Sequence, residues 1–171
     1  CNRRNEYCEM TSDAFFETRS CLARSGLDVA FVDGLHTYRQ ALRDVESCLR
    51  YLNPHGVIVM YDCNPPDEAA AHPATSRAHA QSLNLPGWNN EWCGDSYKAL
   101  IHLRSTRNDL NALTFDSDYG LGVVMRGVPE SRLDYTPEQI EAMRYAAFAA
   151  DRARILNLKA ADQFEAWIQG I

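Results

Sequence analysis

The chain has 171 residues, 46% of them hydrophobic and 23% charged, which is the size and composition of one soluble globular domain. Its formal net charge is −6 and no run of Lys or Arg occurs, so we expect no nucleic-acid partner, which would need a basic face. No stretch of about 18 apolar residues occurs and the polar start CNRRNEYC is unlike a signal peptide, so we expect no membrane span and no membrane partner.

Six cysteines are scattered along the chain, at positions 1, 8, 21, 48, 63 and 93, with no C-x-x-C pair and no Cys/His spacing typical of zinc sites. We interpret them as reduced thiols of a cytoplasmic protein, because disulfides are rare in that compartment. The first residue is Cys1 and not Met, so we expect the chain to be processed or to be part of a longer protein.

The first part of the chain predicts a helix followed by a strand–helix–strand unit. Residues 10–26 begin with capping residues, carry apolar positions at helical spacing and end at a glycine, which predicts a helix. Residues 29–32 and 57–61 are unbroken apolar runs, typical of strands buried on both faces of a parallel sheet. Between them, residues 38–52 have the spacing of an amphipathic helix that stops at the breaker NPHG, residues 53–56. This order predicts a right-handed parallel crossover.

The middle of the chain predicts a long loop, a helix and a hairpin. Residues 63–94 are irregular and rich in proline, and a loop of this length in a compact domain is usually a lid or a binding loop. Asp95 is expected to cap a helix that reaches Arg104. Residues 113–116 and 121–125 are strand candidates joined by a tight turn, so they predict an antiparallel hairpin.

The last part of the chain predicts helices. Residues 136–139 form a capping box that opens a helix running to about Arg154, and a last short helix carries Phe164, Trp167 and Ile168. The whole pattern predicts an α/β fold with a Rossmann-like, mostly parallel sheet, an antiparallel C-terminal hairpin and C-terminal helices.

Two acids stand where the predicted parallel strands end, Asp33 and Asp62. His36 follows Asp33 at the start of the next predicted helix. Ligands bind at the carboxyl ends of strands in open parallel sheets, and neighbouring strands lie about 5 Å apart. We therefore expect Asp33, His36 and Asp62 to converge on one pocket. The alternative, in which Asp33 or His36 only caps the next helix, stays open at this point.

The two strands and the helix between them resemble the fourth-strand to fifth-strand segment of bacterial class I S-adenosylmethionine-dependent methyltransferases of the small-molecule O-methyltransferase type. That family's pattern has DG-x-H-x-Y after the first of these strands, L-x-P-G-G after the helix, and HDC or a similar end to the next strand. Here the three read DGLHTY at 33–38, LNPHG at 52–56 and YDC at 61–63. The stretch MTSDAFF at 10–16 resembles the one after the family's third strand, and the resemblance reaches to about Arg126.

The resemblance implies S-adenosylmethionine as cofactor and methyl transfer to a hydroxyl of a small-molecule acceptor, such as a sugar or natural product. It implies cofactor contacts from Ser12 and Asp13, because their stretch packs against the adenine in that family, and from Asp33, Gly34 and His36. His36 is the expected catalytic base, because the unperturbed pKa of histidine lies near neutrality. Asp62 is the second expected catalytic residue.

The sequence also departs from the family pattern. The 171 residues contain no E-x-G-x-x-x-G turn and no ribose-binding acid after a second strand, so we expect both upstream of Cys1. Residues 1–128 are then the C-terminal portion of a methyltransferase domain, and residues 129–171 are a helical extension. This chain is expected to bind S-adenosylmethionine weakly or not at all.

A metal is the less favoured expectation. Tyr61 stands where the family often has His or Asp, which leaves Asp33 and Asp62 as the ligands for a Mg²⁺ ion.

Other side chains carry weaker signals. His72 and His79 lie in the long loop, where histidines are usually solvated, although they could reach the pocket. Trp88 and Trp92 either line an acceptor pocket or pack the loop down. The sequence DSD at 116–118 is interpreted as a turn and not as a metal motif.

A second function stays open beside the enzyme. It is a non-catalytic, truncated or split methyltransferase fold that acts in association, for example as a homo-oligomer. The missing glycine-rich turn favours this function, and an open sheet edge would expose unpaired backbone. The presence of Asp33, His36 and Asp62 favours the enzyme.

Overall fold

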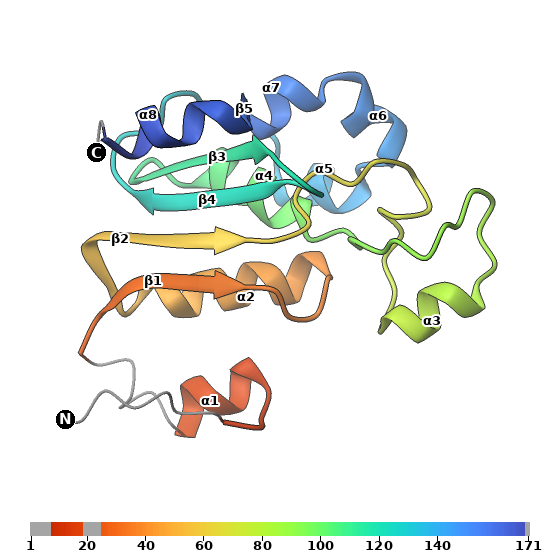
Figure 1. Cartoon of the computed structure of the whole chain (residues 1–171), viewed down its shortest axis with the longest axis horizontal. Helices are drawn as coiled ribbons and strands as arrows, with labels where there is room; N and C mark the ends of the chain where they lie inside the picture. Colours follow the sequence, from red (N-terminus) through yellow and green to blue (C-terminus); the bar gives the residue numbers. More distant parts are fainter. Residues whose placement is uncertain (1–7, 19–24, 170–171) are drawn as a thin grey trace.

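A computed structural model describes residues 8–18 and 25–169 of the chain. Five strands form one sheet in the order β1-β2-β4-β3-β5 (Figure 1). The strands are β1 (Leu27–Val32), β2 (Leu52–Met60), β3 (Leu110–Asp116), β4 (Leu121–Arg126) and β5 (Leu158–Ala160). The helices are α1 (Ser12–Thr18), α2 (Tyr38–Leu49), α3 (Arg77–Ser82), α4 (Tyr97–Thr106), α5 (Pro137–Ala142), α6 (Tyr145–Ala150), α7 (Arg152–Leu156) and α8 (Phe164–Gln169), with a 3₁₀ turn η2 (Ala161–Gln163) before the last.

The predicted α/β fold with a Rossmann-like sheet is confirmed. β1 pairs with β2 in parallel and β3 pairs with β5 in parallel, while β4 is antiparallel to both of its neighbours. Within the described residues, β4 is therefore the strand that runs against the others, as a mostly parallel sheet with an antiparallel hairpin requires.

The predicted parallel crossover is present as β1–α2–β2. Val29 lies opposite Val57 and Val32 lies opposite Met60, so both strands end at the same edge of the sheet. α2 covers one face of this pair with its apolar side, burying residues that include Val45 and Leu49. Periodic apolar residues form this helix because burial of one stripe against the sheet stabilises it.

The start of β2 differs from the prediction. α2 ends at Leu49, and residues 53–56 belong to the strand instead of breaking the chain before it. A register shift between Leu27 and Val29 accommodates them, as expected for a bulge beside a proline. A Cβ at Gly56 would lie 2.5 Å from the Leu27 carbonyl oxygen, so the close approach of these strands needs a glycine there.

The predicted hairpin is confirmed, and it lies in the same sheet because β4 pairs with β2. Leu113 lies opposite Val123, and Val59 of β2 lies on the other side of Val123. The turn is closed by a hydrogen bond from Gly120 N to Ser117 O at 2.8 Å, so Ser117 and Asp118 belong to the turn, while Asp116 is the last residue of β3.

Predictions for the long loop and for the C-terminal part need correction. The long loop contains α3, whose first turn is capped by the Ser76 side chain. The helix expected from the capping box to Arg154 is broken into α5, α6 and α7, because the backbone is extended at Met143 and Arg144 and leaves the helical region at Asp151. The C-terminal part also adds a strand, β5. The capping box itself and the last helix with Phe164, Trp167 and Ile168 are confirmed. The first predicted helix is present as α1, and residues 19–24 of that prediction lie outside the described residues.

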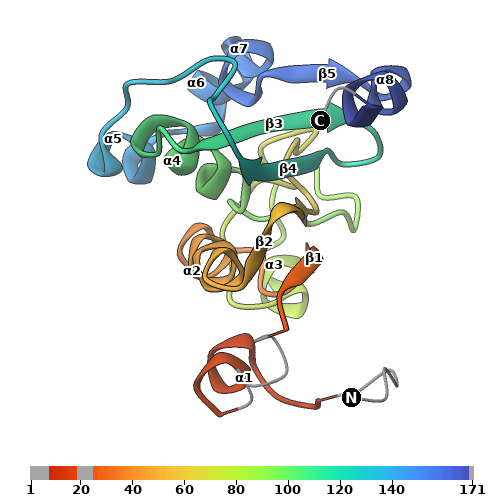
Figure 2. The ribbon, with the colours of Figure 1, turned by 90° about the vertical axis from the view of Figure 1, so that its left-hand side faces the viewer.

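Figure 2 shows the sheet nearly edge-on, with α2 and α4 on one side and α8 on the other side near β3 and β5. The core lies under the α2 and α4 layer, where Ile58, Leu100 and Val124 are fully buried. On the opposite face of the edge strand β1, Val29 is 68% exposed and Phe31 is 61% exposed. None of the helices in residues 8–18 and 25–169 is both long and apolar enough to cross a lipid bilayer.

The uneven burial of the sheet predicts uneven effects of truncating its apolar residues. Ile58→Ala should lower the free energy of unfolding by about 2–5 kcal/mol, because Ile58 is fully buried in the central part of the core. Val29→Ala on the neighbouring strand should change it by less than about 0.5 kcal/mol, because Val29 is largely exposed. Urea denaturation of the three proteins measures both values. Equal effects at the two positions would contradict the core described above.

Candidate functional site

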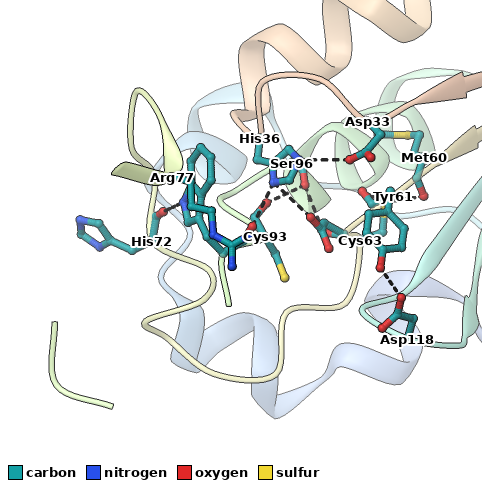
Figure 3. Close-up of polar contacts among 12 residues, drawn as sticks. Asp33, His36, Met60, Tyr61, Cys63, His72, Arg77, Cys93, Ser96 and Asp118 are labelled. Carbon is teal, nitrogen blue, oxygen red and sulfur yellow. Dashed lines mark hydrogen bonds and ion pairs between the residues drawn. The ribbon is translucent and has the colours of Figure 1, made fainter. Parts of the chain in front are cut away.

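Asp33, His36 and Asp62 meet at the carboxyl ends of β1 and β2, as the strand ends predicted. The distance from His36 Nε2 to Asp33 Oδ1 is 3.2 Å, and that from His36 Nδ1 to Asp62 Oδ2 is 3.1 Å. One ligand-type atom from each residue lies within 4.8 Å of the others. Figure 3 shows His36 and Asp33 facing each other beside Cys93 and Ser96. The imidazole therefore lies between two carboxylates.

His36 is positioned by the helix it precedes and by the loop opposite. Asp95 accepts a hydrogen bond from Tyr38 N at 2.8 Å, so its side chain caps the N-terminus of α2, which is distant in the sequence. The sequence had suggested that Asp95 caps α4, the helix that follows it. The Trp92 carbonyl lies 3.0 Å from His36 Nδ1, and the Trp92 ring stacks on the imidazole at 5.0 Å. Nδ1 therefore faces two acceptors, the Trp92 carbonyl and the Asp62 carboxylate, whereas Nε2 faces one, Asp33 Oδ1. We assign the hydrogen of the neutral ring to Nδ1, so that Nε2 is the nitrogen that exchanges a proton.

Asp62 is the buried member of the cluster, with 4% of its surface exposed. The pKa of its carboxyl is raised to about 6, mainly by burial and to a smaller extent by the charges of Asp33 and Asp118, while His36 and a hydrogen bond from Cys93 oppose the rise. The backbone of Asp62 has φ +60°, in the left-handed region that non-glycine residues seldom adopt. A buried acid in an unusual backbone conformation is a frequent feature of functional sites.

Tyr61 precedes Asp62 and points its hydroxyl away from the cluster. The hydroxyl donates a hydrogen bond to Asp118 in the β3–β4 turn (Figure 3), and this bond is the main reason that the pKa of Tyr61 is raised. The turn residue Asp118 therefore fixes the end of β2 through Tyr61.

A cavity of about 400 Å³ opens beside this cluster. Its lining combines the three site residues with side chains from the end of β2, the long loop and the hairpin turn: Asp33, His36, Tyr61, Asp62, Arg77, Glu91, Trp92, Cys93 and Tyr119. It is small and mostly polar in character, which suits a hydroxylated small molecule. We refer to it as the inner cavity.

A second cavity of about 630 Å³ lies between α1, the end of β1 and α2, and we refer to it as the outer cavity. It is lined by Ser12, Asp13, Asp33 and Gly34, four of the five predicted cofactor-binding residues, together with Phe15, Phe16 and Gln40 among others. His36, the fifth, lines the inner cavity instead. Asp33 lines both cavities, so they are neighbours.

Gln40 organises the outer cavity and was missed in the sequence. Its Nε2 donates to Asp44 Oδ1 at 2.9 Å and reaches Ser12 Oγ and Asp13 Oδ1, each at 3.3 Å. Arg43 pairs with Asp13 at 2.8 Å. These contacts hold α1 against α2, and no local sequence signal reveals them because the partners are far apart in the chain.

Other candidates are placed away from the inner cavity. His72 contributes its carbonyl oxygen to the Trp92 indole N–H at 2.9 Å, and His79 Nδ1 accepts from Thr75 N. Neither histidine lines the inner cavity, and neither does Trp88, whereas Trp92 both lines it and packs the loop onto His36. A further cavity of about 670 Å³ between α2, α4 and α5 contains none of the predicted site residues.

The fold and the strand-end cluster define an α/β domain with a Rossmann-like sheet and two adjoining cavities at its carboxyl edge. Residues 2–63 match a family model described as a methyltransferase domain, a segment that includes Asp33, His36 and Asp62. The matched segment is about a third of the chain, and over this segment the protein is similar to methyltransferase domains. No curated protein and no solved structure matched the chain.

The raised pKa of Asp62 predicts a pH-dependent stability. The folded value of about 6 exceeds the ordinary value of about 3.9, so the favourable contribution of the protonated acid is complete below about pH 4 and is lost as pH rises through about 6. Asp62→Asn removes this loss, and Asn tolerates the left-handed backbone. The quantity to compare is the free energy of unfolding of the variant minus that of wild type. It should be up to about 3 kcal/mol higher above about pH 7 than at pH 4.

Denaturation of both proteins in EDTA across this pH range measures the effect. Glu91→Gln, which removes an acid of the same cavity, is the control and should show no such dependence. A stability difference between wild type and Asp62→Asn that stays flat with pH would show that Asp62 is not a raised buried acid.

Proposed function

We propose that this protein transfers a methyl group from S-adenosylmethionine to a hydroxyl of a small molecule, such as a sugar or natural product. The observation that carries the proposal is the sharing of Asp33 between the two cavities, with His36 on the inner one. A cofactor in the outer cavity and an acceptor in the inner cavity would meet at Asp33. Holding two reactants in line is a main source of rate enhancement in such transfers.

In the proposed reaction, the acceptor oxygen forms a bond to the methyl carbon while the bond from that carbon to the sulfonium sulfur breaks. The products are a methyl ether and S-adenosylhomocysteine, and the hydroxyl proton passes to His36 Nε2. The new N–H then faces Asp33 Oδ1, which lies 3.2 Å away. Asp62 and the Trp92 carbonyl hold the other ring nitrogen, at 3.1 and 3.0 Å, so they keep Nε2 available as the base.

A bound divalent ion is the alternative way to activate the hydroxyl. The donor set of Asp33, His36 and Asp62 fits such an ion, because two carboxylates and an imidazole converge within 4.8 Å. An ion held there would lower the pKa of an acceptor hydroxyl. We favour the histidine as base, because Tyr61 is turned towards Asp118 and adds no further ligand.

The non-catalytic function is supported by a different feature, the exposed apolar side chains Val29 and Phe31 on the edge strand β1. Such a face suits association with another chain or another copy. It leaves the buried Asp62 and its contacts with His36 without a role, so we place it second.

Cofactor binding separates the two functions. We expect S-adenosylmethionine and S-adenosylhomocysteine to bind this chain weakly, because its 171 residues lack the glycine-rich turn, and to shift the amide NMR signals of residues 10–16 and 33–35. Asp13→Asn should weaken the shifts, whereas Glu46→Gln, on α2 outside the outer cavity, should not.

Calorimetry measures the affinity itself. A dissociation constant of micromolar or better, about −8 kcal/mol, would show that the missing turn is dispensable. Shifts confined to other residues would refute the outer cavity as the cofactor site.

Activity measurements separate the two modes of hydroxyl activation. Methyl transfer from labelled S-adenosylmethionine is assayed against a panel of hydroxylated sugars and natural products. With His36 as the base, His36→Ala should lower the rate by about 10²–10⁴ and EDTA should have no effect. With a metal, EDTA should abolish turnover, and Asp62→Asn should be as damaging as Asp33→Asn. If EDTA and all three substitutions leave the rate within a few-fold of wild type, the inner cavity is not the active site.

A further inference from the structure

The five residues Trp92–Ser96, at the end of the long loop, contact both halves of the His36–Asp62 pair, and we call them the clamp segment. Hydrogen bonds on the side away from His36 hold its backbone in place, because Cys93 N and Gly94 N both donate to the Ala70 carbonyl at 2.9 Å. Ala70 itself is 1% exposed. The segment is therefore anchored in the protein interior and presents its other side to the cluster.

Trp92 contacts the histidine half. Its carbonyl lies 3.0 Å from His36 Nδ1, and its ring stacks on the imidazole with 25° between the ring planes. The indole N–H donates to the His72 carbonyl at 2.9 Å, which fixes the orientation of the ring. Two independent contacts, a polar one at the ring edge and an apolar one on the ring face, thus restrict the rotation of the imidazole.

Ser96 contacts the aspartate half. Its hydroxyl is buried, with the residue 4% exposed, and lies 3.1 Å from both the Asp62 carbonyl and the Cys93 carbonyl. The hydroxyl therefore links the clamp segment to the residue whose φ is +60°. Left-handed backbone at a non-glycine residue persists where its surroundings impose it, and a buried hydroxyl on its carbonyl is such a restraint. Figure 3 shows Ser96 beside His36, with Cys93 next to it.

Gly94 allows the close approach between the clamp segment and His36. A Cβ at this position would lie 1.8 Å from the His36 carbonyl oxygen, and the glycine has φ +61°. Any other residue would push the segment away from the loop that carries His36. The backbone contact, the ring contact and the hydroxyl contact therefore depend on one tight packing arrangement.

We propose that Trp92 and Ser96 are positioning residues, which hold His36 and Asp62 in contact and fix the hydrogen of the neutral imidazole on Nδ1. Neither residue has to touch the transferred group. Their effect on methyl transfer rests on the proposed function, whereas their effect on the histidine does not. The two effects are measured separately.

The first experiment reads the tautomer of His36 by long-range ¹H–¹⁵N NMR of the labelled chain, at a pH at which its ring signals no longer change with further addition of base. The His36→Gln variant assigns its signals. Wild type should show the hydrogen on Nδ1, against the preference of free histidine for Nε2. Ser96→Ala and Trp92→Leu should increase the share of the Nε2 tautomer, whereas Trp92→Phe, which keeps a stacking ring, should not.

Ser105→Ala is the matched control, because Ser105 lies on α4, the helix that Ser96 precedes, and its hydroxyl also donates to a backbone carbonyl, that of Ile101 at 2.7 Å. Backbone amide spectra of the sheet confirm that each variant is folded. The proposal is overturned if folded Ser96→Ala and Trp92→Leu keep the wild-type tautomer, or if Ser105→Ala changes it as much as they do.

The second experiment measures methyl transfer with the assay described above. Ser96→Ala and Trp92→Leu should lower kcat by about 10- to 100-fold, the usual effect of misplacing a catalytic group, with the KM for S-adenosylmethionine unchanged. Trp92→Phe should restore most of kcat. A fall in kcat with an unchanged tautomer would refute positioning of the imidazole, and an altered tautomer in a protein without methyl transfer would refute only the proposed function.

Discussion

The parallel register of β1 and β2 is the constraint on which the candidate site depends. Val32 lies opposite Met60, so Asp33 and Asp62 leave the sheet at the same edge. The crossover helix α2 then begins at Tyr38, which places His36 in the short joint between them. A slip of one residue in this pairing would turn every side chain of β2 to the opposite face, which would expose Ile58 and Met60 and turn the smaller Val57 and Val59 into the core. Core packing therefore fixes the geometry of the site.

The cluster of Asp33, His36 and Asp62 lowers the stability of the folded protein and is kept in place by contacts with other parts of the chain. A carboxylate at Asp62 is buried, has a raised pKa and lies on left-handed backbone. The residues that restrain it belong to distant parts of the chain, with Ser96 on its carbonyl and His36 on its carboxylate. The Asp62→Asn stability test measures this conflict directly. Unfavourable local features that several contacts impose together are typical of functional sites and not of structural ones.

The sequence predicted the parts of the fold and the site that follow from local patterns. Unbroken apolar runs located β1 and β2, and their terminal acids located Asp33 and Asp62, because strand ends are readable from hydrophobicity alone. The breaks between α5, α6 and α7 were not predictable, since the residues around Met143 and Arg144 favour helix and tertiary packing extends the backbone there. Gln40, Ser96 and the capping of α2 by Asp95 were also missed, because each acts on a partner far away in sequence. Of the four loop residues singled out in the sequence, His72, His79, Trp88 and Trp92, only Trp92 lines the inner cavity.

The position of Asp33 between the two cavities has a consequence for the charges in the proposed reaction. Before methyl transfer, the positive charge in the site belongs to the sulfonium group, and Asp33 lines the cavity proposed to hold it. Transfer of the methyl group removes that charge from sulfur, and proton transfer to His36 places a positive charge on the imidazole, 3.2 Å from the same carboxylate. The number of positive charges beside Asp33 and Asp62 thus stays constant through the reaction. A carboxylate that accepted the proton would become neutral, so the total charge of the site would also stay constant with Asp33 or Asp62 as the base. The difference lies in the interactions of the protonated group: an imidazolium is attracted by two carboxylates, Asp33 at 3.2 Å and Asp62 at 3.1 Å, whereas a protonated carboxyl would lose its charge and with it this attraction. This attraction favours the imidazole as the group that accepts the proton.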